Sequence, residues 1–349
     1  MATFTTVGSS IAGISAAVPA VRIDNMEYEL LTPSEQQLFV KTTGIRYRHV
    51  AGPGQTTGDL CYAAANQLLN KLNWRAEDVD LIIMVSQSPD YFLPATAIIL
   101  QDRLGMKKSS VALDINLGCS GYVYGLSVIS AMMQTGAFKK ALLLAGDVST
   151  AATNKKDKST YPLFGDAGTA TALEYNRDYE IAFDLNSDGS GQRAIYIPHG
   201  GIRHPIDATT FEEQTLEGGI IRHQRNLWLD GSEVFNFSVR EAPTSIQTLL
   251  NFTGTSADEI DYLVLHQANK LMDETIRKKL KFPAEKVPYT LHDFGNTSSA
   301  SIPLTIAHAC RDRQALTTKW LLSGFGVGLS WGSAQFTSHQ LVLPEILYI

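Results

Sequence analysis

Two kinds of hydrophobic pattern alternate along the chain. Short apolar runs occur at 81–86 and 262–265, as strands that are buried on both faces require, and 111–115 is a strand-like run. The segments 57–72 and 272–280 instead place apolar residues at helical spacing. Strands that alternate with helices predict an α/β fold, in which helices cover a mixed, mostly parallel sheet.

The remaining segments refine this pattern. Residues 1–18 are mildly apolar, lack a basic lead-in and contain Gly8 and Gly13, which predicts a buried strand rather than a secretory signal. Apolar runs nowhere reach about 18 residues, so we expect no membrane-spanning segment. Segment 197–225 has weak periodicity and several Gly and His residues, which predicts an insertion or loop region.

The pattern repeats after about 180 residues, which is too long a unit for a solenoid. Three pairs of segments match at nearly this spacing: 78–84 with 259–265, 118–120 with 295–297, and 140–146 with 319–324. We therefore predict two pseudo-equivalent halves, 1–177 and 178–349, that join near the polar stretch 175–179. Two such halves would stack as five layers, α/β/α/β/α.

Amino-acid composition excludes several classes of function. Of 349 residues, 44% are hydrophobic and 18% are charged, which is typical of a globular protein. The net charge of −6 argues against nucleic acid as the main partner, because phosphate binding needs clustered Lys and Arg. Three cysteines without Cys-x-x-Cys spacing indicate neither a disulfide framework nor a zinc site, and favour a reducing, cytoplasmic location.

Cys119 is the first candidate for catalysis. It lies between the strand-like run 111–115 and a helical pattern that starts near Gly121. A cysteine at a helix N-terminus is stabilised as the thiolate, so we expect a lowered pKa. Its backbone N–H could also stabilise an oxyanion. Cys61 and Cys310 lie in helical Ala- and Leu-containing stretches, and we expect both to be buried and inert.

His266 and Asn296 are the second and third candidates. His266 follows the strand 262–265, and α/β folds place ligands at such strand ends. Asn296 alone would suit a turn or a helix cap, but it occupies the position of Cys119 in the second half. Equivalent turns of two packed halves would converge on one cavity. The other histidines are expected in surface, loop or hydrogen-bonded positions: His49, His199, His204, His223, His292, His308 and His339.

A glycine-rich segment spans 324–332. It resembles a phosphate-binding loop only weakly, because no Lys-Ser/Thr pair follows it. A loop that offers backbone N–H donors beside the nucleophile fits better, and glycines that pack within a helix are the alternative.

These motifs together resemble the thiolase superfamily, and within it the β-ketoacyl-acyl-carrier-protein synthase III family. The resemblance extends over nearly the whole chain, through segments 41–49, 116–121, 164–168, 231–235, 266–269 and 295–298 and the glycine-rich end. As a set, these segments are highly specific.

The resemblance implies a decarboxylative Claisen condensation. Cys119 would carry the acyl group, and the backbone N–H groups of Cys119 and Val327 would form the oxyanion hole. His266 and Asn296 would stabilise the enolate that forms when a malonyl thioester, expected to be malonyl-acyl-carrier-protein, loses CO₂. The product would be a 3-oxoacyl thioester. The substrates would be CoA or phosphopantetheine thioesters, and no other cofactor is implied.

The resemblance also implies partners. A twofold homodimer is the family expectation, with Phe92 or Leu93 closing the partner's pocket. The basic stretch with Lys270, Arg277 and Lys278 would dock an acidic acyl carrier protein, although most such stretches are solvated helix faces.

The chain departs from the family at its expected CoA contacts. Leu38 and Thr42 stand where a Trp and an Arg are usual, and Lys158 stands where another Arg is usual. Ser232 and Phe235 complete the predicted substrate- or CoA-binding set. Because an adenine-stacking clamp is lost, we expect a specialised member that acts on an unusual or carrier-bound acyl group in a secondary pathway.

Other functions remain possible at this stage. An acyltransferase of the same fold could move the acyl group to an alcohol or amine without decarboxylation. Papain-like proteases also carry Cys, His and Asn in this chain order, but the duplicated α/β pattern argues against a cysteine hydrolase. A non-catalytic subunit of a condensing-enzyme heterodimer would usually lose the triad that this chain keeps.

Overall fold

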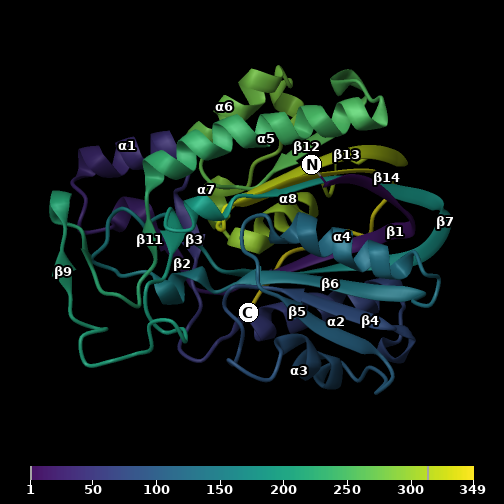
Figure 1. Cartoon of the computed structure of the whole chain (residues 1–349), viewed down its shortest axis with the longest axis horizontal. Coiled ribbons are helices and arrows are strands. Elements are labelled where there is room, and N and C mark those ends of the chain that lie inside the picture. The colour runs from purple at the N-terminus through teal and green to yellow at the C-terminus, as the bar shows by residue number, and fades with distance from the viewer. Residues whose placement is uncertain (1, 313) are drawn as a thin grey trace.

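Five layers make up the body of the protein. The computed structural model describes residues 2–312 and 314–349. Figure 1 shows the layers stacked from α5 and α6 at the top, through one sheet, the central helices α4 and α8 and a second sheet, to α2 and α3 at the bottom. This arrangement confirms the predicted duplicated α/β fold.

The body is built from six helices and eight strands. The helices are α2 (Thr57–Leu72), α3 (Thr96–Arg103), α4 (Gly121–Met133), α5 (Gly231–Thr253), α6 (Lys270–Leu280) and α8 (Ser301–Ala309). The strands are β1 (Ala2–Val18), β4 (Leu81–Val85), β5 (Val111–Ile115), β6 (Lys140–Asp147), β7 (Ala167–Ser187), β12 (Tyr262–Leu265), β13 (Thr317–Gly326) and β14 (Ser330–His339). Further elements described around this body are α1 (Pro33–Thr43), α7 (Leu291–Phe294), β2 (Arg22–Asp24), β3 (Tyr47–His49), β8 (Ile195–Tyr196), β9 (Gln214–Thr215), β10 (Ile221–Arg222), β11 (Trp228–Leu229) and β15 (Leu347–Tyr348).

The strand order repeats. One sheet runs β4-β6-β7-β1, and the other runs β12-β13-β14-β7. In each, the first pair is parallel and the next two pairs are antiparallel. The long strand β7 belongs to both sheets, because residues 167–174 pair with β6 and residues 181–187 pair with β14. The predicted boundary between residues 177 and 178 falls inside β7 and stays a prediction.

Hydrophobic packing explains the layers. Three clusters of buried side chains occupy the interfaces between helices and sheets. The cluster between the two sheets includes Tyr122 of α4 and Ile302 of α8. The outer clusters include Leu249 of α5 on one side and Leu68 of α2 on the other. Burial of apolar area is the main force that holds such layers together.

Several predicted elements match the structure closely. The strands at 111–115 and 262–265 and the helix at 57–72 have the predicted bounds. The helix expected at 272–280 begins earlier, at Lys270. The Asn269 side chain caps the N-terminus of this helix because it accepts a hydrogen bond from the Met272 N–H. Within the described residues, no helix combines the length and the apolar character that a membrane crossing requires.

The segment between β7 and α5 lies beside the layers, at the left of Figure 1. Its described elements are the short strands β8–β11 and two short 3-10 helices, Gly189–Gly191 and Glu217–Gly219, as the weak periodicity of 197–225 predicted. A buried ion pair joins this segment to the loop between β6 and β7, with Arg222 Nε 3.1 Å from Asp157 Oδ2. The segment therefore has a fixed position, and its residues Ile197, Leu227 and Leu229 wall the cavity described next.

Candidate active site

The three candidate side chains meet in one cavity of about 330 Å³. Cys119, His266, Asn296 and Val327 all line it, although they come from four different segments of the chain. Cys119 lies in the turn before α4, and Asn296 lies in the turn that leads to α8, the other central helix. Equivalent turns of the two halves thus converge on one site.

Close packing shapes the Cys119 turn. A Cβ added to Gly121 would lie 2.5 Å from Val85 Cγ1, so a side chain there would clash with the neighbouring strand. The Ser120 and Ser330 hydroxyls, 2.7 Å apart, tie the turn to the start of β14. The backbone N–H groups of Val327 and of Cys119 itself hydrogen-bond to the sulfur. Two donors therefore point at the place where an oxyanion would form.

The predicted lowering of the Cys119 pKa is wrong. Burial raises the pKa of the thiol to about 11, and the negative charge of Asp147 adds to this effect. Hydrogen bonds from Val327 and Ser298 oppose the rise without cancelling it. The sequence shows the helix N-terminus but does not show that the sulfur is desolvated beside a carboxylate, and desolvation disfavours the charged form.

The glycine-rich segment is a β-hairpin between β13 and β14. The alternative of glycines packed within a helix is therefore wrong. A Cβ on Gly326 would lie 2.6 Å from Cys119 Cβ, so glycine allows the hairpin to approach the nucleophile. This approach brings the Val327 N–H to the sulfur, as the backbone-donor interpretation expected.

His266 is buried at the end of β12. Its Nδ1 lies 2.7 Å from Ser301 Oγ. Burial lowers the pKa of the imidazole to about 3, so the ring is neutral at physiological pH. A neutral imidazole offers one N–H donor.

The oxygen of the Asn296 carboxamide already accepts a hydrogen bond within its own turn. Its Oδ1 accepts a hydrogen bond from the Ser298 N–H at 2.9 Å, so the turn that its sequence suggested is present. No hydrogen bond is described for its Nδ2 group. Asn296 therefore holds its own loop through the oxygen and offers N–H donors to the cavity.

Sequence reasoning missed Asp147. This fully buried carboxyl ends β6 and lines the same cavity. It accepts hydrogen bonds from the Gln87 N–H at 2.7 Å and from the Ser299 hydroxyl at 2.7 Å. The argument that singled out His266, a polar residue directly after an apolar strand, applies equally to Asp147 after 140–146 and could have found it.

The predicted binding residues lie outside the cavity wall. Leu38, Thr42 and Lys158 line a recess that shares Ser159 with the cavity. Thr42, Ser232 and Phe235 line a second recess that shares Gly231 with it. Both recesses adjoin the cavity, and the binding role of these side chains stays a prediction.

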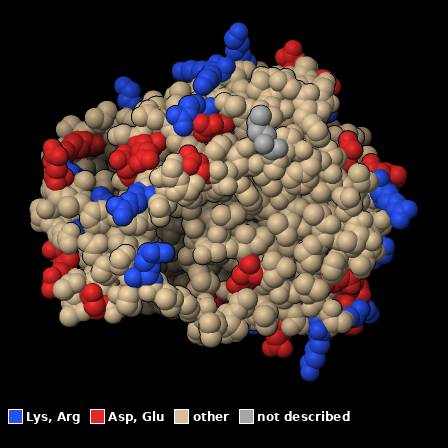
Figure 2. Space-filling model, viewed as in Figure 1, with Lys and Arg blue, Asp and Glu red and all other residues tan. Residues whose placement is uncertain are grey.

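The basic stretch forms the exposed face of α6. Figure 2 shows Lys and Arg side chains gathered at the upper edge, where Figure 1 places α6. Lys270 and Lys278 are exposed there. Arg277 is less available than predicted, because its guanidinium forms an ion pair with Glu274 at 2.8 Å and donates to the Phe282 carbonyl at 2.6 Å.

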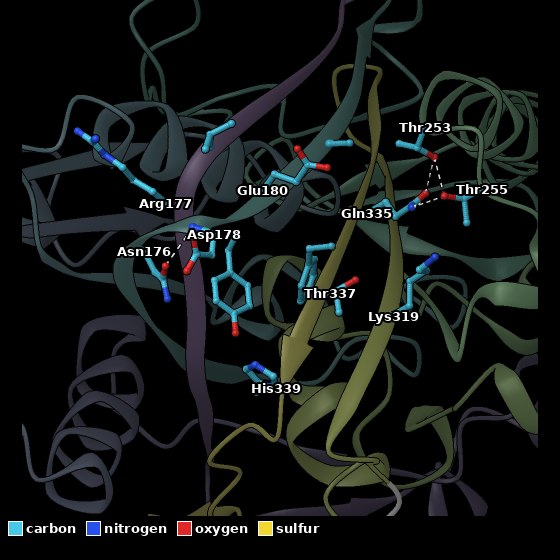
Figure 3. A pocket seen from close by; sticks show the side chains of 14 residues that line it. Asn176, Arg177, Asp178, Glu180, Thr253, Thr255, Lys319, Gln335, Thr337 and His339 are labelled. Atoms are coloured by element: carbon cyan, nitrogen blue, oxygen red, sulfur yellow. Dashed lines mark hydrogen bonds between the residues drawn. The ribbon is translucent and has the colours of Figure 1, made fainter.

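A larger cavity, of about 710 Å³, opens around the middle of β7 and the adjoining strands. Figure 3 shows mixed charges along its wall, from Arg177, Asp178, Glu180 and Lys319. Thr253 and Thr255 hydrogen-bond to Gln335, so these polar groups satisfy one another. None of the predicted catalytic side chains is among its described lining residues. Size alone therefore does not identify the active site.

Two profiles of one known protein family match this chain. The profile for 3-oxoacyl-acyl-carrier-protein (ACP) synthase III matches residues 113–189, which include Cys119. The profile for the C-terminal part of the same family matches residues 250–337, which include His266, Asn296 and Val327.

Individual relatives match along the whole chain. The β-ketoacyl-acyl-carrier-protein synthase III of Desulfitobacterium hafniense is 34% identical over 331 residues, covering 94% of this chain and 97% of its own. The enzyme of the same name from Rhodopirellula baltica is 35% identical over 350 residues, covering 94% of this chain and 98% of its own.

Solved structures agree as well. A 3-oxoacyl-(acyl-carrier protein) synthase from Burkholderia xenovorans superposes with a TM-score of 0.93 at 40% identity, with 99% of each chain covered. A priming β-ketosynthase of a polyketide pathway superposes with a TM-score of 0.84 over 97% of this chain and 98% of its own; at 22% identity, it shows the shared fold. On sequence and structure together, the chain belongs to the β-ketoacyl-acyl-carrier-protein synthase III family.

Proposed function

We propose that this protein catalyses the decarboxylative condensation of an acyl thioester with a malonyl thioester, giving a 3-oxoacyl thioester and CO₂. One observation carries the proposal. A thiol, two backbone N–H donors, a neutral imidazole and a carboxamide N–H line the same buried cavity. Membership of the synthase III family supports the same reaction.

In the first half-reaction, Cys119 takes the acyl group. Its sulfur attacks the thioester carbonyl while the carbonyl oxygen gains negative charge. The N–H groups of Cys119 and Val327, which hydrogen-bond to the sulfur in the free protein, are positioned to receive that oxygen. Donors fixed before the reaction stabilise the transition state without reorganisation.

In the second half-reaction, His266 and Asn296 hold the malonyl thioester oxygen. Loss of CO₂ leaves an enolate, so no base is needed to generate the carbanion. Ser301 can donate its hydroxyl proton to His266 Nδ1, which leaves the N–H on the other ring nitrogen. Asn296 contributes the N–H group that its own turn does not use. The enolate carbon then attacks the acyl group on Cys119.

The donor is proposed to be an unusual or carrier-bound acyl thioester. The cavity wall includes Leu163, Phe164 and Leu229, which suit an apolar acyl group. Ser238 adds a buried hydroxyl without a hydrogen-bond partner among the described residues, which could meet a substrate amide or oxygen. Among the described residues that line the recess at Leu38 and Lys158, Phe39 is the one aromatic side chain that could stack. CoA or phosphopantetheine thioesters serve as substrates, and we propose no resident cofactor.

We further propose a homodimer. Tyr91, Phe92 and Leu93 are exposed by 62%, 79% and 78%, and β5 ends its sheet with an open edge that carries the exposed Val111. An exposed apolar loop and an unpaired strand edge both favour pairing with a second copy. Sedimentation of wild type should give a dimer and that of Phe92→Asp a monomer, whereas a wild-type monomer would contradict the proposal. A cytoplasmic location, expected from three free cysteines, stays a prediction.

Intact-mass spectrometry tests the function. The protein is incubated with a panel of acyl-CoA and acyl-carrier-protein donors, with Cys119→Ser as the control. An acyl-sized mass increase in wild type that is absent in the variant would identify Cys119 as the nucleophile and the best donor as the substrate. If no donor modifies wild type, the condensing reaction proposed here is wrong.

A further inference from the structure

The loop that carries Val327 needs support from outside itself. In the proposed first step, the Val327 N–H is one of the two donors that receive the thioester oxygen. Val327 lies in the short loop between β13 and β14, and Gly326 and Gly328 stand on either side of it. Glycine restricts the backbone less than any other residue. The loop sequence therefore does not fix the direction of this N–H group, and contacts with neighbouring residues have to do so.

The Ser330 hydroxyl supplies one such contact. It donates a hydrogen bond to the Val327 carbonyl oxygen, with Ser330 Oγ 2.7 Å from that oxygen. Ser330 is the first residue of β14 and pairs with Gly326, the last residue of β13, so it lies at the base of the loop. Ser330 is buried, and a hydrogen bond that is shielded from water is stronger than an exposed one. This bond holds Val327 from its C-terminal side.

A second hydroxyl connects this bond to the nucleophile turn. Ser120, the residue directly after Cys119, has its Oγ 2.7 Å from Ser330 Oγ. A carbonyl oxygen can only accept, so the single hydroxyl proton of Ser330 is already used on Val327. Ser120 is therefore the donor in the bond between the two serines, and Ser330 is the acceptor. The result is a directed chain from the Ser120 hydroxyl through the Ser330 hydroxyl to the Val327 carbonyl.

The ordinary role of a serine at this position does not account for Ser120. It is the N-cap residue of α4, and an N-cap serine usually has an extended backbone and accepts a hydrogen bond from the first helical turn. Ser120 has helical backbone angles instead, with φ −86° and ψ −10°, and none of the described N–H groups of that turn donates to its side chain. Its hydroxyl is used on the hairpin rather than on the helix.

The hairpin and the Cys119 turn are also in close contact. A Cβ built on Gly326 would lie 2.6 Å from Cys119 Cβ, and one built on Gly324 would lie 2.9 Å from the Cys119 carbonyl oxygen. Cys119 and Val327 line the same cavity. A donor in an oxyanion hole works at about 2.7–3.1 Å from the oxygen, so a loop displaced by about 1 Å would lose much of its effect. Small changes in how the two segments are joined should therefore affect the reaction.

We propose that Ser120 and Ser330 are positioning residues that fix the Val327 N–H relative to the Cys119 N–H. The two hydroxyls join the residue after the nucleophile to the carbonyl of the loop residue. Neither serine is among the described residues that line the cavity, so both act through the donors and not by contact with the substrate. Donors that are fixed in advance need no reorganisation as negative charge develops on the thioester oxygen. This inference rests on the proposed function and deepens its first step.

Single substitutions test the chain of hydroxyls. Acylation of Cys119 is followed by intact mass, with the donor that modifies wild type fastest in the acyl-CoA and acyl-carrier-protein panel. Ser120→Ala and Ser330→Ala should each lower the maximal acylation rate by about tenfold and change the half-saturating donor concentration by less than about threefold, because a misplaced donor affects the transition state more than the bound substrate. Ser330→Thr keeps the hydroxyl and should stay within about threefold of wild type.

Ser333→Ala is the matched control. It removes a buried hydroxyl from the same strand, where Ser333 Oγ lies 3.0 Å from Ser245 Oγ, but it leaves the chain of hydroxyls intact. We expect this variant to acylate at close to the wild-type rate. Alkylation by iodoacetamide needs no oxyanion hole, so it should stay within about threefold of wild type in every variant. An equal loss in alkylation and acylation would mean that the substitutions disturb the thiol itself, and the positioning role would be wrong.

The double variant distinguishes one chain from two independent bonds. Ser120 acts on Val327 only through Ser330, so Ser120→Ala should add little once Ser330 is also alanine. Ser120→Ala/Ser330→Ala should acylate no more than about twofold slower than Ser330→Ala. A loss equal to the product of the two single losses would show independent effects and would contradict the chain.

The remaining outcomes are distinct. If wild type is acylated and both alanine variants react as fast as Ser333→Ala, the positioning role is wrong and the proposed function stands. Ser330→Thr as slow as Ser330→Ala would show that the hydroxyl is not what matters, and would also overturn the inference. If one alanine variant does not fold by circular dichroism, the other decides by the same comparison. If no donor acylates wild type while iodoacetamide still modifies Cys119, the proposed function fails and the inference fails with it.

Discussion

Cys119 illustrates how one residue depends on the balance between burial and hydrogen bonding. Its sulfur meets two backbone N–H groups and the Ser298 hydroxyl, yet desolvation and the Asp147 charge have the larger effect on its pKa. The Cys119 thiol therefore stays protonated until a bound substrate can accept the negative charge that develops. The oxyanion donors then stabilise the charge on the substrate rather than on the free sulfur.

This environment predicts the pH dependence of thiol alkylation. A pKa raised to about 11 means that the thiolate fraction, and with it the rate of iodoacetamide alkylation of Cys119, rises throughout pH 7 to 10 without a plateau. The rate is measured by intact mass, with Cys119→Ser as the blank. A plateau reached below pH 8 would show that the thiolate is already stabilised in the free protein.

Substitution of Asn296 should separate the two half-reactions. Asn296→Asp keeps the oxygen that accepts from the Ser298 N–H but lacks the N–H donors. We expect malonyl decarboxylation to fall by about 10²- to 10³-fold, because one donor to the developing oxyanion is lost. Acylation of Cys119, followed by intact mass, should persist. Equal losses in both steps would mean that Asn296 only supports the fold.

At the scale of elements, α6 contains an unusual buried acid. Asp273 is fully buried, and neither carboxyl oxygen has a hydrogen-bond partner among the described residues. Burial holds the pKa of this carboxyl well above its ordinary value, so the folded protein keeps it protonated where the unfolded chain ionises it. The folded state is therefore relatively most stable below the unfolded-state pKa and loses stability as pH rises through the interval up to the folded-state pKa.

Asp273→Asn should remove this loss. Since the amide cannot ionise, the variant should resemble wild type at pH 4 and exceed its free energy of unfolding by about 1–3 kcal/mol at pH 8. Urea unfolding at the two pH values measures the difference, and the exposed Asp258→Asn serves as the control. A variant that is no more stable at pH 8 would show that Asp273 ionises in the folded protein without cost.

The exposed face of α6 carries a second prediction. Charge reversal at Lys270 and Lys278 should raise the KM for a carrier-protein substrate several-fold, because attraction of an acidic partner weakens, and should leave kcat with a small thioester unchanged. Arg277 is left intact, since reversing it would break its ion pair with Glu274. Lys71→Glu, on the exposed end of α2, is the matched control. An unchanged KM for the carrier protein would show that this face is an ordinary solvated helix face.

At the scale of the whole molecule, the duplicated pattern allows much of the fold to be predicted. The repeat of 118–120 at 295–297 predicts that Cys119 and Asn296 face one cavity, because both turns lead into the central helices α4 and α8. Alternating strand and helix patterns depend on neighbouring residues and can therefore be recognised in the sequence. Asp147 follows the apolar run 140–146 and could have been noticed, but its contact with Ser299 of the other half is not visible in the sequence.

Energetic consequences of burial are also invisible in the sequence. The helix N-terminus at Cys119 is a local feature, but desolvation by the packed hairpin 326–330 depends on long-range packing. For the same reason, Arg277 could be recognised as basic but not as already paired with Glu274. Prediction from sequence thus succeeds for elements and for the convergence of Cys119, His266 and Asn296 on one cavity, and fails for the protonation of the thiol.

The most direct test of the central proposal is the ratio of CO₂ released to 3-oxoacyl thioester formed. The protein is first acylated at Cys119 and then mixed with malonyl-acyl-carrier-protein labelled at its free carboxyl. Condensation predicts one CO₂ for each 3-oxoacyl product, together with loss of the acyl adduct from Cys119. Transfer of the acyl group to an alcohol or amine without CO₂, or an adduct that persists, would contradict decarboxylative condensation.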